Sequence, residues 1–235
     1  MNYAVILAGG RGVRTGNKLP KQFCMLDDKP IIAYSIDAFS SVESVDVIIV
    51  ACNSEYIKVM DEIALKYFPC PDRVRVVNGG DSRGGSLVLA LESLSALDPA
   101  EEDKVLIHEA ARPGLTKKVI KKHLEQLDIY GATNTLGPVV DLMVTSKNGH
   151  SIDTALSKRE VFHGQAPQGY RVGELLEFTC RSEVRRKLQE DMDLCELYLN
   201  DGRSVGIVIG GQELTKITFE HDVEIVKMLL RSTRD

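Results

Sequence analysis

A glycine-rich stretch near the amino terminus constrains the fold more than any other part of the chain. It follows a short apolar run, residues 3–7, which predicts a buried strand. Four of the eight residues from 9 to 16 are glycine, so the backbone can approach a ligand closely and turn its N–H groups inward. Two cations, Arg14 and Lys21, belong to the same stretch. Strand, glycine loop and cations together predict a phosphate-binding loop.

Two common phosphate-binding motifs are excluded by their spacing. The Walker motif requires a glycine, four residues and then Gly-Lys, and no window of the sequence has this pattern. The dinucleotide fingerprint G-x-G-x-x-G fails because the step from Gly12 to Gly16 is one residue too long. A tight β–α turn with solvated charges therefore remains the alternative interpretation of this loop.

Length and charge limit the classes of protein to consider. The 235 residues suit one α/β domain spanning 1–235, and the net charge of −5 argues against a broad nucleic-acid surface. We expect neither a signal peptide nor a membrane span, because no apolar run is long enough. The five scattered cysteines form no C-x-x-C pair, which favours reduced thiols and a cytoplasmic location.

Apolar strand patterns alternate with helical patterns along most of the chain. This alternation predicts an α/β fold, a Rossmann-like, doubly wound and mostly parallel sheet with helices on both faces. Thr116 is the expected N-cap of the fourth helix. The expected strands are residues 3–7, 45–51, 74–77, 104–108 and 205–209, and the expected helices are 30–39, 55–68, 86–97, 116–127 and 220–230, with others starting near 172 and 193.

The alternation stops between residues 137 and 163. Residues 138–145 and 151–154 have strand character, and Asn148-Gly149 between them is a favoured hairpin turn. The pattern predicts a β-hairpin that either extends the sheet edge or protrudes as an arm at about 137–163.

Charged side chains follow several of the expected strands. In a parallel sheet, ligands bind at the carboxyl ends of the strands, so we expect these groups to meet. One carboxylate among several cations and two glycine loops suits a nucleoside triphosphate with its magnesium. The groups are the loop with Arg14 and Lys21, the glycine loop 79–86, the pair Glu109 and Arg112, and the pair Lys216 and Thr218.

Five motifs, in order, extend this interpretation. They are LAGGRGVRTGNKLPKQF at 7–23, GGDSRGGS at 79–86, HEAARP at 108–113, QAPQ at 165–168 and TKIT at 215–218. Together they resemble the sugar-alcohol-phosphate cytidylyltransferase family over nearly the whole chain. The resemblance implies transfer of CMP from CTP to a polyol phosphate, of the ribitol 5-phosphate or 2-C-methyl-D-erythritol 4-phosphate type, with release of pyrophosphate. It also implies Mg²⁺, and a role in isoprenoid, teichoic-acid or capsule synthesis.

The resemblance also implies roles for individual residues. Residues in the arm would cross to a second subunit in a homodimer, with Arg159 binding the partner's acceptor phosphate. The implied assignments are catalysis by Arg14, Lys21 and Lys216, nucleotide binding by Leu7, Ala8, Gly9, Gly10, Arg11, Gly12, Gly80, Asp81, Arg83 and Ser86, acceptor binding by Arg112, Asp141, Leu142, Arg159 and Ala166, and metal binding by Glu109.

Three positions depart from the family pattern. Glu109 stands where the family has a metal-binding aspartate, and Leu142 and Ala166 stand where it has threonines that face the acceptor. The acceptor half of the site therefore matches the family pattern less well than the nucleotide half does. Two alternatives stay open: a nucleotidyltransferase for another base or acceptor, such as a phosphonate or sugar phosphate, and a non-catalytic nucleotide-binding relative. We interpret His108 as structural, and His163 and His221 as surface or supporting residues.

Overall fold

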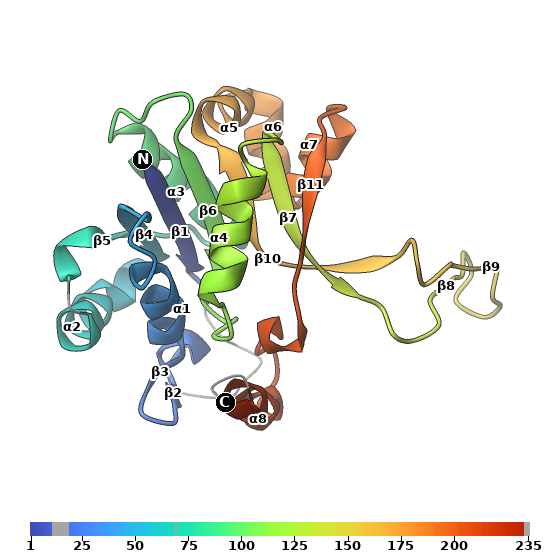
Figure 1. Ribbon diagram of the computed structural model, residues 1–235, viewed down its shortest axis with the longest axis horizontal. Coiled ribbons are helices and arrows are strands. Elements are labelled where there is room, and N and C mark those ends of the chain that lie inside the picture. Colours follow the sequence, from blue (N-terminus) through green and yellow to red (C-terminus); the bar gives the residue numbers. More distant parts are fainter. Residues whose placement is uncertain (11–18, 69, 233–235) are drawn as a thin grey trace.

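A seven-stranded sheet forms the centre of the computed structural model, which describes residues 1–10, 19–68 and 70–232 (Figure 1). The strand order is β11-β7-β10-β6-β1-β4-β5. The strands are β1 (Asn2–Ala8), β4 (Val47–Cys52), β5 (Val74–Asn78), β6 (Lys104–Glu109), β7 (Ala132–Pro138), β10 (Phe162–Arg171) and β11 (Val205–Ile209).

The pairing of the strands confirms a mostly parallel sheet. β1 pairs in parallel with β4 and β6, β4 with β5, and β7 with β11. β10 alone among the described strands of this sheet is antiparallel to its neighbours, β6 and β7. The sequence predicted five of these strands, but neither β7 nor β10.

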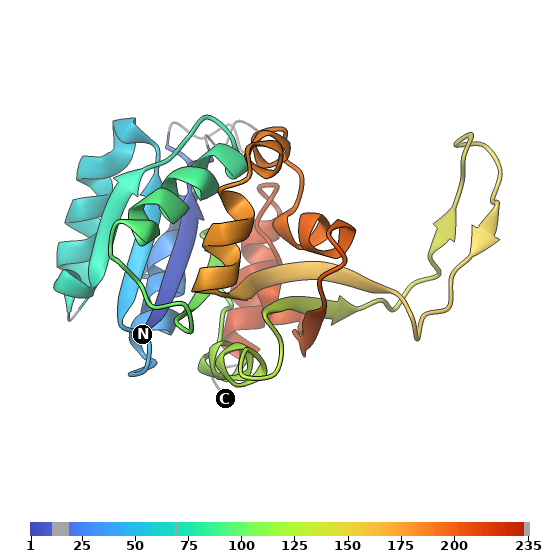
Figure 2. The ribbon, with the colours of Figure 1, turned by 90° about the horizontal axis from the view of Figure 1, so that it is seen from above.

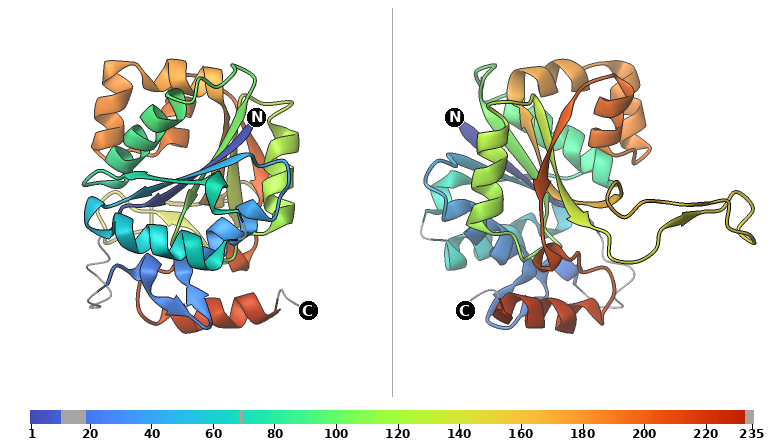
Figure 3. Two further views of the ribbon diagram at one scale, coloured as in Figure 1. Left: turned by 90° about the vertical axis from the view of Figure 1, so that its left-hand side faces the viewer. Right: turned by 45° about the vertical axis from the view of Figure 1, so that its right-hand side comes forward.

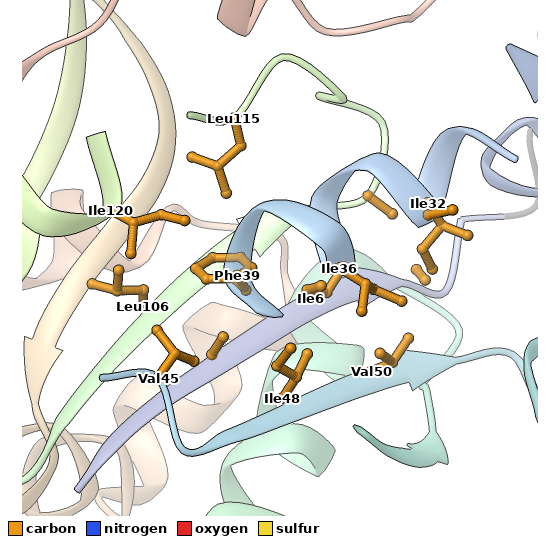
Figure 4. Packing of buried hydrophobic residues seen from close by; sticks show 14 of the residues in the cluster. Ile6, Ile32, Ile36, Phe39, Val45, Ile48, Val50, Leu106, Leu115 and Ile120 are labelled. Carbon is orange, nitrogen blue, oxygen red and sulfur yellow. The ribbon is translucent and has the colours of Figure 1, made fainter. Parts of the chain in front are cut away.

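Helices cover both faces of the sheet (Figure 3). Successive side chains of a strand point to opposite faces, and β1 is buried from Tyr3 to Ala8. Ala4 and Ile6 pack with side chains of α1 (Ile31–Ser40), α2 (Ile57–Tyr67) and α4 (Lys117–Gln126), as Figure 4 shows in part. Tyr3 and Val5 pack on the other face with side chains of α3 (Arg83–Ser95), α5 (Val172–Thr179), α6 (Ser182–Gln189) and α7 (Leu194–Asn200).

Two helix starts bear on the functional site. The Thr116 hydroxyl accepts a hydrogen bond from the N–H of Val119, which confirms the expected N-cap of α4. α3 begins at Arg83, so the expected start at Ser86 was wrong by almost one turn. The hydroxyl of Ser82 caps α3 by accepting from Gly85 N–H. The first turn of α3 thus reaches the carboxyl end of the sheet.

The segment between β7 and β10 projects away from the sheet (Figure 2). Its pairing is shorter than predicted: only β8 (Val144–Thr145) and β9 (Thr154–Ala155) form an antiparallel ladder. Of the expected first strand, 138–145, only Val144–Thr145 pairs in this ladder, while Pro138 is the last residue of β7 in the central sheet. Asn148 lies within the connecting loop and accepts hydrogen bonds from the backbone N–H groups of His150 and Ser151.

The carboxyl-terminal helix α8 (Asp222–Ser232) lies outside the main layers (Figure 1). Its Val226 packs with Ile217 and with Leu26 of the short ladder formed by β2 (Met25–Leu26) and β3 (Lys29–Pro30). This small cluster joins the end of the chain to the segment that follows the glycine loop. Among the described residues, no helix has the length and apolarity that crossing a membrane requires.

Candidate active site

A cavity of about 370 Å³ lies at the carboxyl ends of β1 and β6. Its wall comes from the glycine loop, from the first turn of α3 and from the segment after β6. The lining residues are Leu7, Ala8, Gly9, Gly10, Lys21, Gln22, Asp81, Ser82, Arg83, Ser86, Glu109, Ala110, Ala111 and Lys216.

The glycine loop and the start of α3 meet closely in this cavity. Ser86 is buried, and its hydroxyl accepts a 3.1 Å hydrogen bond from Gly80 N–H and donates to Ser82 O at 2.9 Å. A Cβ added at Gly9 would lie 2.4 Å from the Ser86 hydroxyl oxygen, and one at Gly80 would lie 2.7 Å from the Gly85 carbonyl carbon. Glycine at position 9 therefore lets the amino-terminal loop approach the start of α3, and glycine at position 80 lets the 79–86 segment fold closely against its own helix start.

Two residues after the glycine loop make contacts that hold its first residues and the segment that follows it. Gln22 is buried and donates from Nε2 to the carbonyl oxygens of Ala8 and Gly10, at 2.6 and 2.9 Å. Lys21 donates from Nζ to the carbonyl oxygen of Ile217 at 2.6 Å, which links this loop to the TKIT segment. The predicted site residues Arg11, Gly12 and Arg14 lie outside the described residues.

Glu109, at the end of β6, holds three cations, two of them from distant parts of the chain. Its carboxylate oxygens lie 2.8 Å from Lys216 Nζ, 2.9 Å from Arg112 Nε and 3.2 Å from Arg83 Nε. Arg112 is fixed a second time, because it donates to the carbonyl oxygen of Leu214 at 2.8 Å. The HEAARP and TKIT motifs and the start of α3 are thus joined at one carboxylate.

The cations keep Glu109 ionised. Burial alone raises the pKa of this carboxyl, but the positive charges of Lys216, Arg112 and Arg83 outweigh that effect and hold the pKa well below its usual range. The carboxylate remains charged at any pH at which the protein would work. The site therefore offers one fixed negative charge with oxygen ligands, surrounded by cations that suit phosphate oxygens.

A second cavity, of about 250 Å³, adjoins the first. Arg83 and Glu109 line both cavities and stand between them. The remaining wall of the second cavity is polar and consists of Arg112, Asn134, Gly164, Gln165, Gln168, Asp191 and Asp193. A molecule in each cavity would meet the other at the Glu109 cluster, so the arrangement can bring a nucleotide and an acceptor together.

Comparison with models of protein families places the chain in one family. Residues 2–232 match the family model described as IspD: 2-C-methyl-D-erythritol 4-phosphate cytidylyltransferase. The chain belongs to the IspD family. It is accordingly a cytidylyltransferase, a nucleotidyltransferase whose family acts on CTP and a phosphorylated sugar alcohol.

Solved structures of IspD-family enzymes share the fold. The 4-diphosphocytidyl-2C-methyl-D-erythritol synthase of Anaerococcus prevotii is 22% identical, with a TM-score of 0.80 over 98% of this chain and 96% of that one. The 2-C-methyl-D-erythritol 4-phosphate cytidylyltransferase of Francisella tularensis is 23% identical, with a TM-score of 0.77 over 97% and 98%. The enzyme of Thermus thermophilus is 22% identical, with a TM-score of 0.72 over 97% and 98%.

The structure brings together most of the described residues that the IspD resemblance singled out. The two cavities and their shared wall contain Leu7, Ala8, Gly9, Gly10, Lys21, Asp81, Arg83, Ser86, Glu109, Arg112 and Lys216. Gly80 does not line the first cavity itself. Its N–H donates a hydrogen bond to Ser86, which does line that cavity. These placements agree with the expected grouping at the carboxyl edge of the sheet, while the roles themselves remain predictions.

The acceptor residues expected from the IspD resemblance are more scattered. Leu142 and Arg159 are exposed on the projecting segment, and Asp141 lines a separate cavity at its base. Ala166 is buried but lines neither of the two cavities above. His108 is buried, and its ring Nε2 lies 3.0 Å from the carbonyl oxygen of Arg112, which fits the structural role expected for it.

Sequence reasoning missed several residues of the second cavity. Asn134 lies in β7, which carries too few apolar residues to be recognised as a strand. Asp193 was found only as a helix start, and it does cap α7 by accepting from Cys195 N–H. Gln165 and Gln168 belong to the QAPQ motif of this chain, but the sequence predicted no role for their side chains. For Asn134, Gln165 and Gln168 the signal was a polar residue without an evident local function, whereas the cap of α7 accounted for Asp193.

Proposed function

We propose that the protein transfers the CMP group of CTP to the phosphate of a small polyol phosphate, with release of pyrophosphate. The observation that carries the proposal is the wall of Arg83 and Glu109 between the two cavities. CTP occupies the first cavity, with its base toward Gly80 and Ser86 and its phosphates on the glycine loop. The acceptor occupies the second cavity, and its phosphate faces the shared wall.

The reaction forms one bond and breaks one bond. An acceptor phosphate oxygen attacks the α-phosphorus of CTP, and the bond from that phosphorus to the bridging oxygen of the β-phosphate breaks. A phosphate dianion is already a nucleophile, so no base is required. Lys21 and Lys216, with Arg14, stabilise the charge that develops on the phosphate oxygens, and catalysis consists of positioning and electrostatics.

The residues of the site fit a bound magnesium ion. The ion prefers a few carboxylate oxygens together with substrate phosphates, and Glu109 places such a carboxylate beside the first cavity. No group of three potential metal ligands gathers among the described residues, which is consistent with an ion held largely by the nucleotide. When bound, the ion would neutralise part of the triphosphate charge. Lys216 and Arg112 hold the Glu109 carboxylate in position.

The direct test is pyrophosphate release from CTP and Mg²⁺ with a panel of acceptors. The panel contains 2-C-methyl-D-erythritol 4-phosphate, ribitol 5-phosphate, glycerol 3-phosphate, a sugar 1-phosphate and a simple phosphonate. We expect release that requires both CTP and one polyol phosphate. Release only with the sugar phosphate or the phosphonate would show that the acceptor belongs to a class other than the polyol phosphates. CTP binding without release from any acceptor would favour a non-catalytic role.

We also propose that the projecting segment forms a homodimer. Support comes from its apolar side chains, since Val140, Leu142 and Ile152 are each more than 60% exposed. Replacing Leu142 and Val144 with glutamate should yield monomers in light scattering after gel filtration. The matched control places glutamates at His150 and Ser157, which are exposed and polar. Monomers in the unsubstituted protein at micromolar concentration would contradict the proposal.

A further inference from the structure

We propose that Asn134 determines acceptor specificity, and that the second cavity selects an acceptor whose carbon chain carries hydrogen-bond donors beyond its phosphate. The inference rests on the proposed transfer reaction and concerns the end of the acceptor remote from the reacting phosphate. Hydroxyl groups of a polyol and the ammonium group of an amino alcohol share this donor chemistry.

Asn134 lies on the floor of the second cavity. It is paired with Gln168 of β10 in the central sheet, and side chains of paired residues project to the same face. Both residues line the cavity, and Asn134 is only 9% exposed. The wall around them contains arginines, carboxylates, amides and a glycine, with no aliphatic or aromatic side chain. A ligand chain in this cavity would be held by polar contacts.

The side-chain oxygen of Asn134 lacks a partner. Oδ1 is buried and has no hydrogen-bond partner among the described residues. Leaving a buried acceptor unpaired is costly, so such atoms are rare unless a ligand or water satisfies them. The oxygen of Asn134 is therefore a candidate contact for a ligand.

The neighbouring donors already bond elsewhere. Gln168 Nε2 donates to the Asp193 carboxylate at 2.9 Å, and Gln168 Oε1 accepts from the Tyr170 hydroxyl at 2.9 Å. Gln165 Nε2 donates to Gly211 O at 2.9 Å. Arg83 bonds to Glu109 and lies 3.5 Å from Asp193. This network fixes the shape of the cavity and leaves two buried amide oxygens, those of Asn134 and Gln165, without a donor among the described residues.

The carboxylates of the cavity favour the same kind of ligand. Asp191 and Asp193 lie between α6 and α7, and Asp191 accepts from the N–H of Gly84, in the first turn of α3, at 3.1 Å. Arg112, beside Glu109, can receive the acceptor phosphate. The cavity thus has cations at its wall with the nucleotide cavity, and acceptor oxygens on Asn134, Asp191 and Asp193. An acceptor with a phosphate at one end and hydrogen-bond donors along the rest matches this distribution.

The test compares a long and a short acceptor in the same variant. Asn134→Leu removes the amide and keeps the number and branching of the side-chain heavy atoms. We expect it to lower kcat/KM by about tenfold for ribitol 5-phosphate or 2-C-methyl-D-erythritol 4-phosphate, and by less than about twofold for glycerol 3-phosphate, whose chain ends sooner. The KM for CTP should not change. 5-Aminopentyl phosphate, an amino-alcohol phosphate with the chain length of ribitol 5-phosphate, is assayed beside them, and an Asn134-dependent penalty with this probe identifies the donor as an ammonium group.

The control variant is Thr133→Val, on the opposite face of the same strand. Thr133 is buried against His123 and lines neither cavity, so this variant reproduces a general perturbation of β7 without touching the acceptor. Thr133→Val should affect long and short acceptors equally. Equal penalties for all acceptors in Asn134→Leu would overturn the inference and leave the transfer reaction standing. Absence of transfer to every acceptor by the unsubstituted protein would overturn both.

Discussion

Glu109 and Lys216 are 107 residues apart in the sequence, yet Lys216 Nζ lies 2.8 Å from Glu109 Oε1. The contact joins the end of β6 to the segment before α8. Since Arg83 and Arg112 bond to the same carboxylate, Glu109 organises the positive charge of the site.

Removing the charge of Glu109 should disable the site without unfolding the protein. In Glu109→Gln the three cations lose the anion that holds them, and we expect pyrophosphate release to fall on the order of 100-fold. Glu109→Asp keeps the charge and should retain more activity than Glu109→Gln. The control is Glu125→Gln, which neutralises an exposed carboxylate on α4. Unchanged turnover in Glu109→Gln would refute this role.

Lys21 should contribute to turnover more than to stability. Lys21→Ala removes a cation that lines the nucleotide cavity, so we expect kcat to fall on the order of 100-fold. Its bond to the Ile217 carbonyl is one of several contacts that hold the TKIT segment, so the thermal midpoint should change little. Lys58→Ala, at an exposed position on α2, is the control. Full activity in Lys21→Ala would show that the loop lysine is dispensable.

The buried histidines should make the protein sensitive to acid. Burial lowers the pKa of His123 to about 3 and that of His108 to about 4, whereas unfolded histidine titrates near 6.5. Below pH 6.5 the unfolded state therefore binds more protons, and stability present above that pH is lost as the pH falls. Each histidine should lower the free energy of unfolding by about 1.4 kcal/mol per pH unit between pH 6 and 4.5.

Urea unfolding at several pH values checks this expectation. In His123→Gln the free energy of unfolding should depend less steeply on pH, by the contribution of one histidine, because glutamine does not titrate. His150→Gln replaces an exposed histidine of the projecting segment and should leave the profile unchanged. A profile in His123→Gln as steep as in the unsubstituted protein would show that His123 is not the group responsible.

Two adjacent glycines should differ sharply in tolerance. A Cβ at Gly9 would lie 2.4 Å from the Ser86 hydroxyl oxygen, whereas one at Gly10 would have no described atom within 4 Å. We expect Gly9→Ala to lower the free energy of unfolding by about 1–3 kcal/mol in the absence of nucleotide. Gly10→Ala should stay within about 0.5 kcal/mol. Equal losses of stability in urea unfolding would contradict the close approach described here.

The sequence predicted those parts of the fold that have clear local signals. β11 occupies the expected residues 205–209, and Thr116 caps α4 as expected. β7 and β10 were missed because Thr133 and Asn134 interrupt the apolar pattern of one, while Pro167 lies inside the other. Their stability comes from neighbouring strands, and a local pattern does not report such long-range pairing.

The candidate site likewise has one part that the sequence predicted and one part that it did not. Motif order located Lys21, Glu109 and Lys216 because glycine loops and charged residues after strands are visible in the sequence. The second cavity depends on the pairing of Asn134 with Gln168 across β7 and β10, which only the folded chain reveals. Its unpaired oxygen is a property of the packed structure and has no counterpart in the sequence.

The register between β7 and β10 has a consequence for how this protein can vary. Pro138 and Phe162 are paired partners, so the residues between them leave the sheet and return to it at adjacent points. A shorter turn could close the same two ends at little entropic cost, leaving the rest of the sheet unaltered. The segment 139–161 can therefore be replaced without rebuilding the central sheet. Grafting the corresponding segment of another protein in its place would change which other molecules the protein contacts, while its central sheet stays intact.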